Sequence, residues 1–107
     1  MTDASVYMLV QMEITDQERF FSEYAGPSQP IHQKHGVEVL AGAPEVSVLE
    51  GNYDKNFTVL LKFPSAKAHE DWYNDPDYQP LKNVRKQTTN TNNSTLIVIP
   101  QFIPPHN

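Results

Sequence analysis

Cysteine is absent from the 107 residues of this chain, so disulfides, thiolate metal sites and a cysteine nucleophile are excluded. Basic residues are few: eight Lys and Arg stand against thirteen Asp and Glu, which gives a net charge of −5. This balance argues against nucleic acid or an anionic membrane as a partner, because both bind clustered basic residues. No apolar run approaches the ~20 residues of a membrane span, and no basic leader opens the chain. We therefore expect a soluble, cytoplasmic protein.

The length fits one domain, 1–107, with a core over residues 6–102 and a tail over 103–107. Alternating apolar side chains predict strands over 6–14, 37–51, 57–63 and 96–102, the second broken at 42–44. Capping residues predict a helix over 15–36, kinked or interrupted by its prolines and ended by Gly36. A second helix is expected in two pieces, one over 66–73 capped by Ser65 and one beginning at Asp75-Pro76.

The order β-α-β-β-α-β predicts an α+β, ferredoxin-like fold with a four-stranded antiparallel sheet. Both helices cover one face of such a sheet, and the other face stays open. Here the open face also carries large apolar residues, and such patches mark association surfaces. We therefore expect a homodimer in which two sheets pack face to face around a small barrel-like cavity, and we expect the ligand to bind there.

Several segments resemble the domain-of-unknown-function family 1330, within the dimeric α+β barrel superfamily. These are the opening strand at 7–10, His35-Gly36, the run 46–51, and 63–65 leading to Trp72-Tyr73-Asn74-Asp75-Pro76-Asp77-Tyr78-Gln79. The resemblance spans about residues 6–102. The resemblance implies a dimeric α+β barrel. That superfamily includes cofactor-free enzymes such as polyketide cyclases as well as ligand-binding proteins, so the fold alone does not choose the function.

Two candidate catalytic residues could act as an acid or a base. His35 ends the first helix, where its pKa could be tuned, or where it could simply satisfy a carbonyl at the helix end. Glu50 shares strand parity with Val46 and Val48, so it projects from an apolar face, unless the strand ends there and the carboxylate reaches water.

Arg85 and Tyr78, two turns apart, form the other catalytic pair: together they could hold a carboxylate or enolate oxygen. The alternative is that Tyr78 is a core aromatic and Arg85 an ion-pair or dimer contact. His69, among charged neighbours, is expected to be a solvated surface residue. The side chains expected to contact substrate are His32, Tyr7, Gln11, Glu13, Trp72, Tyr73 and Phe63.

His32 and His35 have the spacing of two metal ligands, but a third ligand with defined spacing is missing, so we predict no metal. We also predict no cofactor, because the sequence contains no phosphate loop, dinucleotide fingerprint or nucleophile elbow. Two functions follow. One is a cofactor-free enzyme that performs acid–base chemistry next to a carbonyl, such as cyclisation, lactonisation or isomerisation of a polyketide-like compound. The alternative is a non-catalytic dimer that binds a small apolar ligand.

Overall fold

The computed structural model describes residues 4–105, and the end of the expected tail, 106–107, lies outside the described residues. Four strands form one sheet: β1 (Val6–Met12), β2 (Glu38–Ala43), β3 (Phe57–Phe63) and β4 (Thr95–Pro100). The helical segments are α1 (Gln17–Arg19), the π-helical η1 (Phe20–Ala25), α2 (Gly26–Lys34), α3 (Ala66–Tyr73), α4 (Gln79–Thr88) and a short η2 (Thr91–Asn93). This order confirms the predicted α+β, ferredoxin-like fold.

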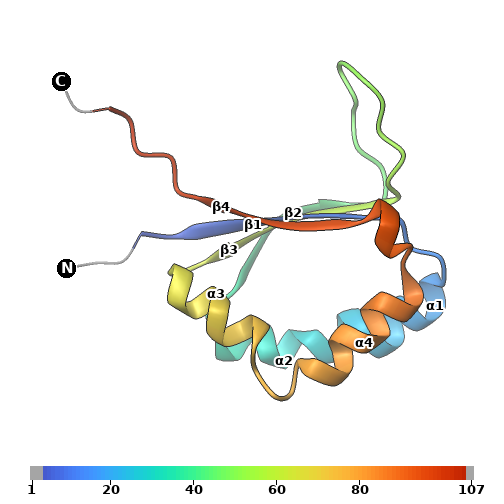
Figure 1. Ribbon diagram of the computed structural model, residues 1–107, viewed down its shortest axis with the longest axis horizontal. Helices are drawn as coiled ribbons and strands as arrows, with labels where there is room; N and C mark the ends of the chain where they lie inside the picture. The colour runs from blue at the N-terminus through green and yellow to red at the C-terminus, as the bar shows by residue number, and fades with distance from the viewer. Residues whose placement is uncertain (1–3, 106–107) are drawn as a thin grey trace.

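The sheet is antiparallel with the strand order β2-β3-β1-β4, so the first and third strands are central. The main helices all lie on one face of the sheet, as Figure 1 shows. The β2–β3 loop projects from the opposite side, at one end of the sheet. A four-stranded sheet covered on one face is the arrangement that the sequence predicts.

The helical residues run without a break from 17 to 34 despite Pro27 and Pro30, so the prolines do not interrupt the helix, and its irregularity is a change from the π-helical η1 to α2 at Gly26. In the π turn the Gly26 amide bonds to the Phe21 carbonyl, five residues back. Pro27 follows this turn, in the first turn of α2. Gly36 ends the run at φ +69°, as predicted.

Four other elements have bounds that differ from the sequence prediction. β1 ends at Met12 and not at residue 14, and β4 covers Thr95–Pro100 and not 96–102. The strand expected over 37–51 ends at Ala43, because Pro44 cannot donate to the ladder, and residues 44–56 form a loop. The helix expected from Asp75-Pro76 begins at Gln79 instead. Asp75 caps a turn rather than a helix: its carboxylate accepts the Asp77 amide at 2.9 Å.

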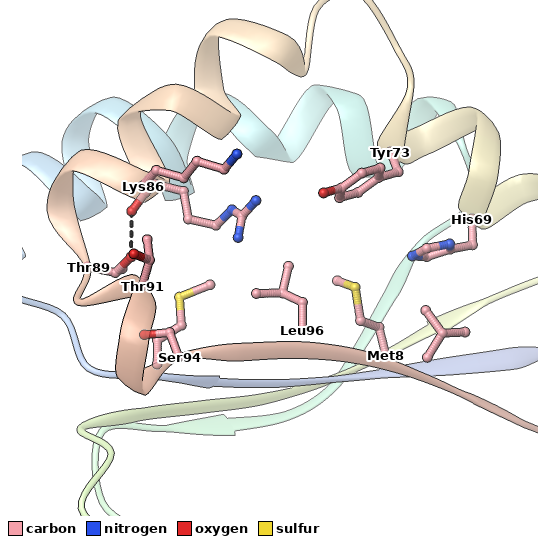
Figure 2. A pocket seen from close by; sticks show the side chains of 11 residues that line it. Met8, His69, Tyr73, Lys86, Thr89, Thr91, Ser94 and Leu96 are labelled. Atoms are coloured by element: carbon pink, nitrogen blue, oxygen red, sulfur yellow. Dashed lines mark hydrogen bonds between the residues drawn. The ribbon is translucent and has the colours of Figure 1, made fainter.

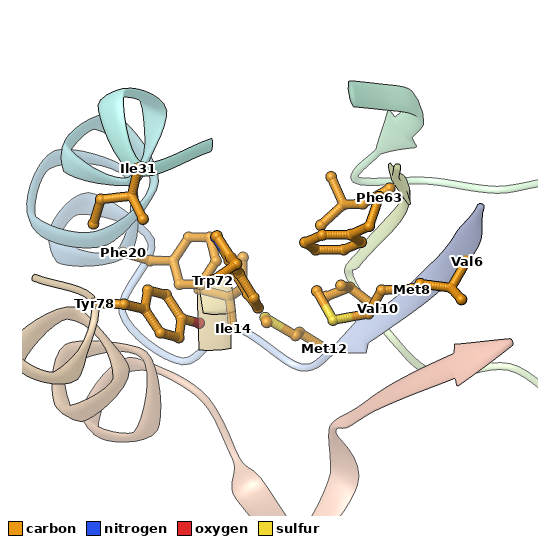
Figure 3. Close-up of a cluster of buried hydrophobic side chains, with 11 residues drawn as sticks. Val6, Met8, Val10, Met12, Ile14, Phe20, Ile31, Phe63, Trp72 and Tyr78 are labelled. Carbon is orange, nitrogen blue, oxygen red and sulfur yellow. The ribbon is translucent and has the colours of Figure 1, made fainter. Parts of the chain in front are cut away.

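The core lies between the sheet and the helices (Figure 3). Alternate residues of β1 point into it, beginning with Val6 and ending with Met12. Phe20, Trp72 and Tyr78 reach the core from the helical side and from the turn before α4. Because β1 is central, its buried face is the floor of both cavities described below.

The other face of the sheet is open and apolar at its centre. The register places Leu9 of β1 between Leu60 of β3 and Ile97 of β4 on this face. Ile97 is 45% exposed and Ile99 is 42% exposed. A soluble chain seldom leaves a row of large aliphatic side chains open to water on a flat sheet.

Candidate functional site

A cavity of about 340 Å³ opens between the sheet and the helices α3 and α4 (Figure 2). Its floor comes from β1 and β4, and its roof from the two helices. We call it the cationic cavity, because two lining side chains are basic and none is acidic. The lining residues are Met8, Met12, His69, Tyr73, Arg85, Lys86, Thr89, Thr91, Ser94, Leu96 and Val98.

Arg85 is the central polar residue of this cavity. It is only 9% exposed, yet no ion pair to it is present among residues 4–105, and its Nε is buried without a hydrogen-bond partner there. Arg85 stands two residues after Asn83 on the last turns of α4, whose sheet-facing side points into the cavity. A buried guanidinium without a carboxylate is costly unless something negative offsets its charge.

Two lysines add positive charge near Arg85, one at the cavity wall and one held beside the cavity by Tyr73. Lys86 follows Arg85 on α4 and is exposed at the cavity wall. Lys82 Nζ lies 3.7 Å from the centre of the Tyr73 ring, a cation–π contact that holds a further positive charge beside the cavity. In Figure 2, Lys86 and His69 stand at opposite ends of the cavity, and Tyr73 lies between them.

His69 lines the same cavity, although the sequence predicted a solvated surface residue. Its ring packs edge-on against Phe63, with the ring centres 4.8 Å apart, and stacks on Tyr73. Nε2 is buried and has no hydrogen-bond partner among the described residues. Burial lowers the pKa of His69, so the imidazole is neutral at neutral pH and can accept a proton.

Tyr78, the predicted partner of Arg85, is fully buried in the turn before α4. Its hydroxyl shares a 2.7 Å hydrogen bond with the hydroxyl of Tyr24. Burial raises the pKa of Tyr78, and the nearby charge of Arg85 opposes that rise. Tyr78 is therefore close enough to Arg85 for its charge to act on the Tyr78 hydroxyl, but Tyr78 does not line the cationic cavity.

His35 lies outside both cavities and joins the end of α2 to the turn after α3. Its Nε2 is 2.7 Å from Oδ2 of Asp75, and Lys34 Nζ lies 2.8 Å from the same oxygen. Lys34 and His35 hold the pKa of Asp75 well below its usual range. Asp75 is buried in this cluster, Lys34 is exposed, and the contacts join the end of α2 to the turn after α3. The sequence did not predict this carboxylate partner for His35.

The remaining predicted site residues are separated from one another. Glu50 is exposed in the 44–56 loop, so the reading in which it reaches water is the one that fits. Tyr7 and Gln11 lie on the open face, and Gln11 accepts a 3.1 Å hydrogen bond from Thr95. Glu13 accepts hydrogen bonds from two asparagines of the loop before β4. None of the four lines either cavity.

Trp72, Phe63 and His32 lie beneath the helices. Phe63 is a fully buried core residue. Trp72 and His32 line a second, apolar cavity, and their ring centres are 6.0 Å apart. His32 and His35 thus face different surroundings. Among residues 4–105 no cluster of three or more potential metal ligands occurs, and no helix there is long and apolar enough to cross a membrane.

Sequence reasoning predicted Arg85 and Tyr73 at the site but missed His69 and Lys86. The spacing of His69 and Tyr73, four residues apart on one helix, was the signal for His69, because residues at i and i+4 share a helix face. Once Tyr73 is placed against the sheet, His69 must lie beside it. The charged neighbours Lys67 and Glu70 point to the other side of α3 and concealed this.

Comparisons with known proteins agree with the fold. A crystal structure of RPA0582, a protein of unknown function from Rhodopseudomonas palustris, superposes with a TM-score of 0.77 at 19% identity, covering 95% of this chain and 85% of that one. The methylated form of RPA0582 gives a TM-score of 0.79 at 17% identity, covering 97% and 85%. No protein of curated function matches the chain. The family model of a domain of unknown function, DUF1330, matches residues 5–100, and the chain therefore belongs to that family.

Proposed function

We propose that this protein binds a small carbonyl compound bearing a negative charge in the cationic cavity and catalyses proton transfer next to the carbonyl without a cofactor. One observation carries the proposal: Arg85 is nine-tenths buried, faces a cavity of about 340 Å³ and has no acidic partner among residues 4–105. Cavities of ~300–1,000 Å³ are the usual size of small-molecule sites. A ligand carboxylate or enolate would supply the missing negative charge.

The composition strengthens this argument. The chain has thirteen acidic residues and only eight Lys and Arg, yet two of those eight line one cavity that no acidic residue lines. Arg presents two parallel N–H groups to a carboxylate, and such charge-assisted pairs are about twice as strong as neutral hydrogen bonds. The cavity therefore has the chemistry of an anion site in a chain that is acidic elsewhere.

His69 supplies the base. Its neutral imidazole takes a proton from the carbon next to the ligand carbonyl, and the electron pair of that C–H bond moves to the carbonyl oxygen. The resulting enolate is stabilised by the guanidinium of Arg85, which faces the cavity. Where a C=C bond of the ligand is conjugated with the enolate, return of the proton from His69 to the far carbon of that bond shifts the double bond and completes an isomerisation. Where the ligand has a second carbonyl, the enolate carbon attacks it, and the alkoxide that forms takes the proton from the His69 imidazolium, which completes a cyclisation.

The test is hydrogen–deuterium exchange in D₂O, followed by proton NMR with 2-oxobutanoate as the probe. Wild-type protein should accelerate loss of the C3 protons above the buffer rate. The His69→Gln variant should lose this acceleration and keep binding, whereas Arg85→Gln should lose both. Lys67→Gln, on the exposed side of α3, is the matched control and should behave as wild type. Wild-type exchange at the buffer rate would refute the catalytic role.

The pH profile provides a second readout for His69. Because burial lowers the pKa of His69 from 6.5, the base should stay deprotonated to below pH 6.5 in the free protein. Exchange activity should therefore persist at pH 6.5 and fall at more acidic pH. An activity that falls with a midpoint well above 6.5 would identify a different base.

The alternative is a non-catalytic binding protein. The observation that favours it is the second cavity, whose lining is mostly apolar and includes no acidic residue, lysine or arginine among the described residues. The same experiment separates the two functions: an Arg85-dependent binding signal without any acceleration of exchange identifies a binder.

We further infer that the protein is a homodimer through the open face of its sheet. The supporting feature is the row formed by Leu9, Leu60 and Ile97, with Ile99 beside it. A stable interface buries about 800 Å² per partner. Sedimentation velocity tests this: wild type should sediment as a dimer and Ile97→Lys as a monomer. Ala66→Lys adds the same charge on the helical side and should leave the dimer intact.

A further inference from the structure

A second cavity, of about 390 Å³, lies on the helical side of the same sheet. It is lined by β1, β2 and β3 on one side and by the η1–α2 run on the other, and we call it the apolar cavity. Its wall includes Phe20, Ala25, Val59, Leu61 and Trp72. Small-molecule sites usually have volumes of ~300–1,000 Å³, and the volume of this cavity falls in that range.

Little in the apolar cavity seeks a charged partner. Ser28 donates its hydroxyl hydrogen bond to the Tyr24 carbonyl at 2.6 Å, and the Tyr24 hydroxyl is bonded to Tyr78. Burial lowers the pKa of His32, so its ring is neutral at neutral pH. No Lys, Arg, Asp or Glu lines this cavity among the described residues. His32 Nδ1 and Trp72 Nε1 are buried without a hydrogen-bond partner among the described residues, so the cavity can accept an occasional polar atom. Its contents should therefore be largely apolar and uncharged.

The two cavities share a wall. Met8 and Met12 line both of them, and each side chain is only 2% exposed. On α3 the division is equally sharp: Trp72 lines the apolar cavity and its neighbour Tyr73 lines the cationic cavity. Methionine is unbranched and has three rotatable bonds, so a rotamer change in Met8 or Met12 can open a passage without moving the backbone.

We propose that the two cavities form one binding site for an amphipathic carboxylate: the carboxylate pairs with Arg85, and the apolar body passes between Met8 and Met12 into the apolar cavity. This rests on the proposed function, because it takes Arg85 as the anion anchor. It adds the substrate class, namely carboxylates with a medium-length apolar body. The continuity of the two linings through the same two methionines commits the apolar cavity to this occupant rather than to a separate ligand.

The test is a chain-length series of linear carboxylates, butanoate, hexanoate and octanoate, with 1-octanol as the uncharged probe. The chain has a single tryptophan, Trp72, and it lines the apolar cavity, so its fluorescence reports occupancy. Burial of each added methylene should tighten the dissociation constant roughly fourfold. Octanol should bind more weakly than octanoate. Equal affinity for butanoate and octanoate would overturn the inference.

Two variants separate this inference from the proposed function. Ala25→Phe fills the apolar cavity and leaves Arg85 in place, so it should abolish the gain with chain length and leave butanoate binding unchanged. Arg85→Gln should weaken every carboxylate and leave octanol unaffected. If butanoate does not bind to wild type in an Arg85-dependent way, the proposed function fails. If it binds and longer chains bind no more tightly, only the two-cavity site fails.

A measurement on wild-type protein covers the case in which Ala25→Phe does not fold. Bromine quenches tryptophan fluorescence on contact, so 8-bromooctanoate and 2-bromooctanoate report which end of the chain reaches Trp72. The proposal requires stronger quenching by the 8-bromo compound at equal saturation. Equal quenching, or stronger quenching by the 2-bromo compound, would place the chain elsewhere and overturn the inference.

Discussion

Replacing Arg85 with methionine should stabilise the ligand-free protein. Methionine keeps the unbranched stem of the arginine side chain and removes a guanidinium that is 9% exposed and has no acidic partner among residues 4–105. Replacing buried ionic groups with apolar residues of similar volume is neutral or stabilising by about 1–4 kcal/mol. Because one side of Arg85 faces a cavity, the lower half of this range applies, about 1–2 kcal/mol. Each kcal/mol corresponds to roughly 4–8 °C in Tm for a domain of this size.

The assay is thermal and urea denaturation at equal protein concentration, since a dimer's Tm depends on concentration. Lys86→Met is the matched control, because it removes the same charge from the same cavity. Lys86 is exposed, so this variant's free energy of unfolding should change by less than about 0.5 kcal/mol. Adding octanoate at 100 times its dissociation constant should stabilise wild type by about 2.7 kcal/mol and should stabilise Arg85→Met less at the same octanoate concentration. A loss of more than about 1 kcal/mol in ligand-free Arg85→Met would show that Arg85 is a structural residue and refute the argument.

Three further predictions concern the scaffold. Lys34 and His35 lower the pKa of Asp75 in the folded protein, so their contacts contribute stability above the unfolded pKa of about 4. This stability is lost as the pH falls through the pKa of Asp75 in the folded protein. Asp75→Asn should therefore lower the urea midpoint at pH 7 and make the midpoint fall less steeply in acid. Phe63→Ala removes a fully buried ring and should lower the free energy of unfolding by about 3–5 kcal/mol in urea. Gly36→Ala places a Cβ at φ +69° and should cost about 1–2 kcal/mol, measured in the same way.

The fold was predictable because its main signals are local. The alternating apolar residues of Phe57–Phe63 gave the bounds of β3, and Ser65 marked the start of α3, where its hydroxyl accepts the Ala68 amide at 3.0 Å. The order of elements then left one common antiparallel topology. By contrast, the helix across Pro27 contains a π turn in which Phe20 is buried, and a π turn has no distinct sequence pattern.

The site was harder to predict than the fold. The cavity expected between two sheets requires a dimer and stays a prediction, and the two cavities described within one chain lie on the helical side of the sheet. A cavity is the volume that packed side chains leave unfilled, and alternation along β1 cannot indicate where Met8 and Met12 fail to meet the helices. Arg85 was recognisable by its chemistry. His69 was not, because its burial depends on how α3 lies against Phe63 and not on its charged neighbours.

The distribution of charge within the chain favours a functional origin for the cationic cavity. Asp75 is buried and pairs with Lys34, a side chain that is 57% exposed and needs no partner to be solvated. Arg85, which is nine-tenths buried and would gain most from a carboxylate, has none among residues 4–105. Selection for stability alone would place the acid at the buried base. Natural sequences break such local rules mainly at functional sites, where an unsatisfied group is kept for a ligand. The unpaired Arg85 is therefore better explained by an anion that binds to it than by the packing of α4.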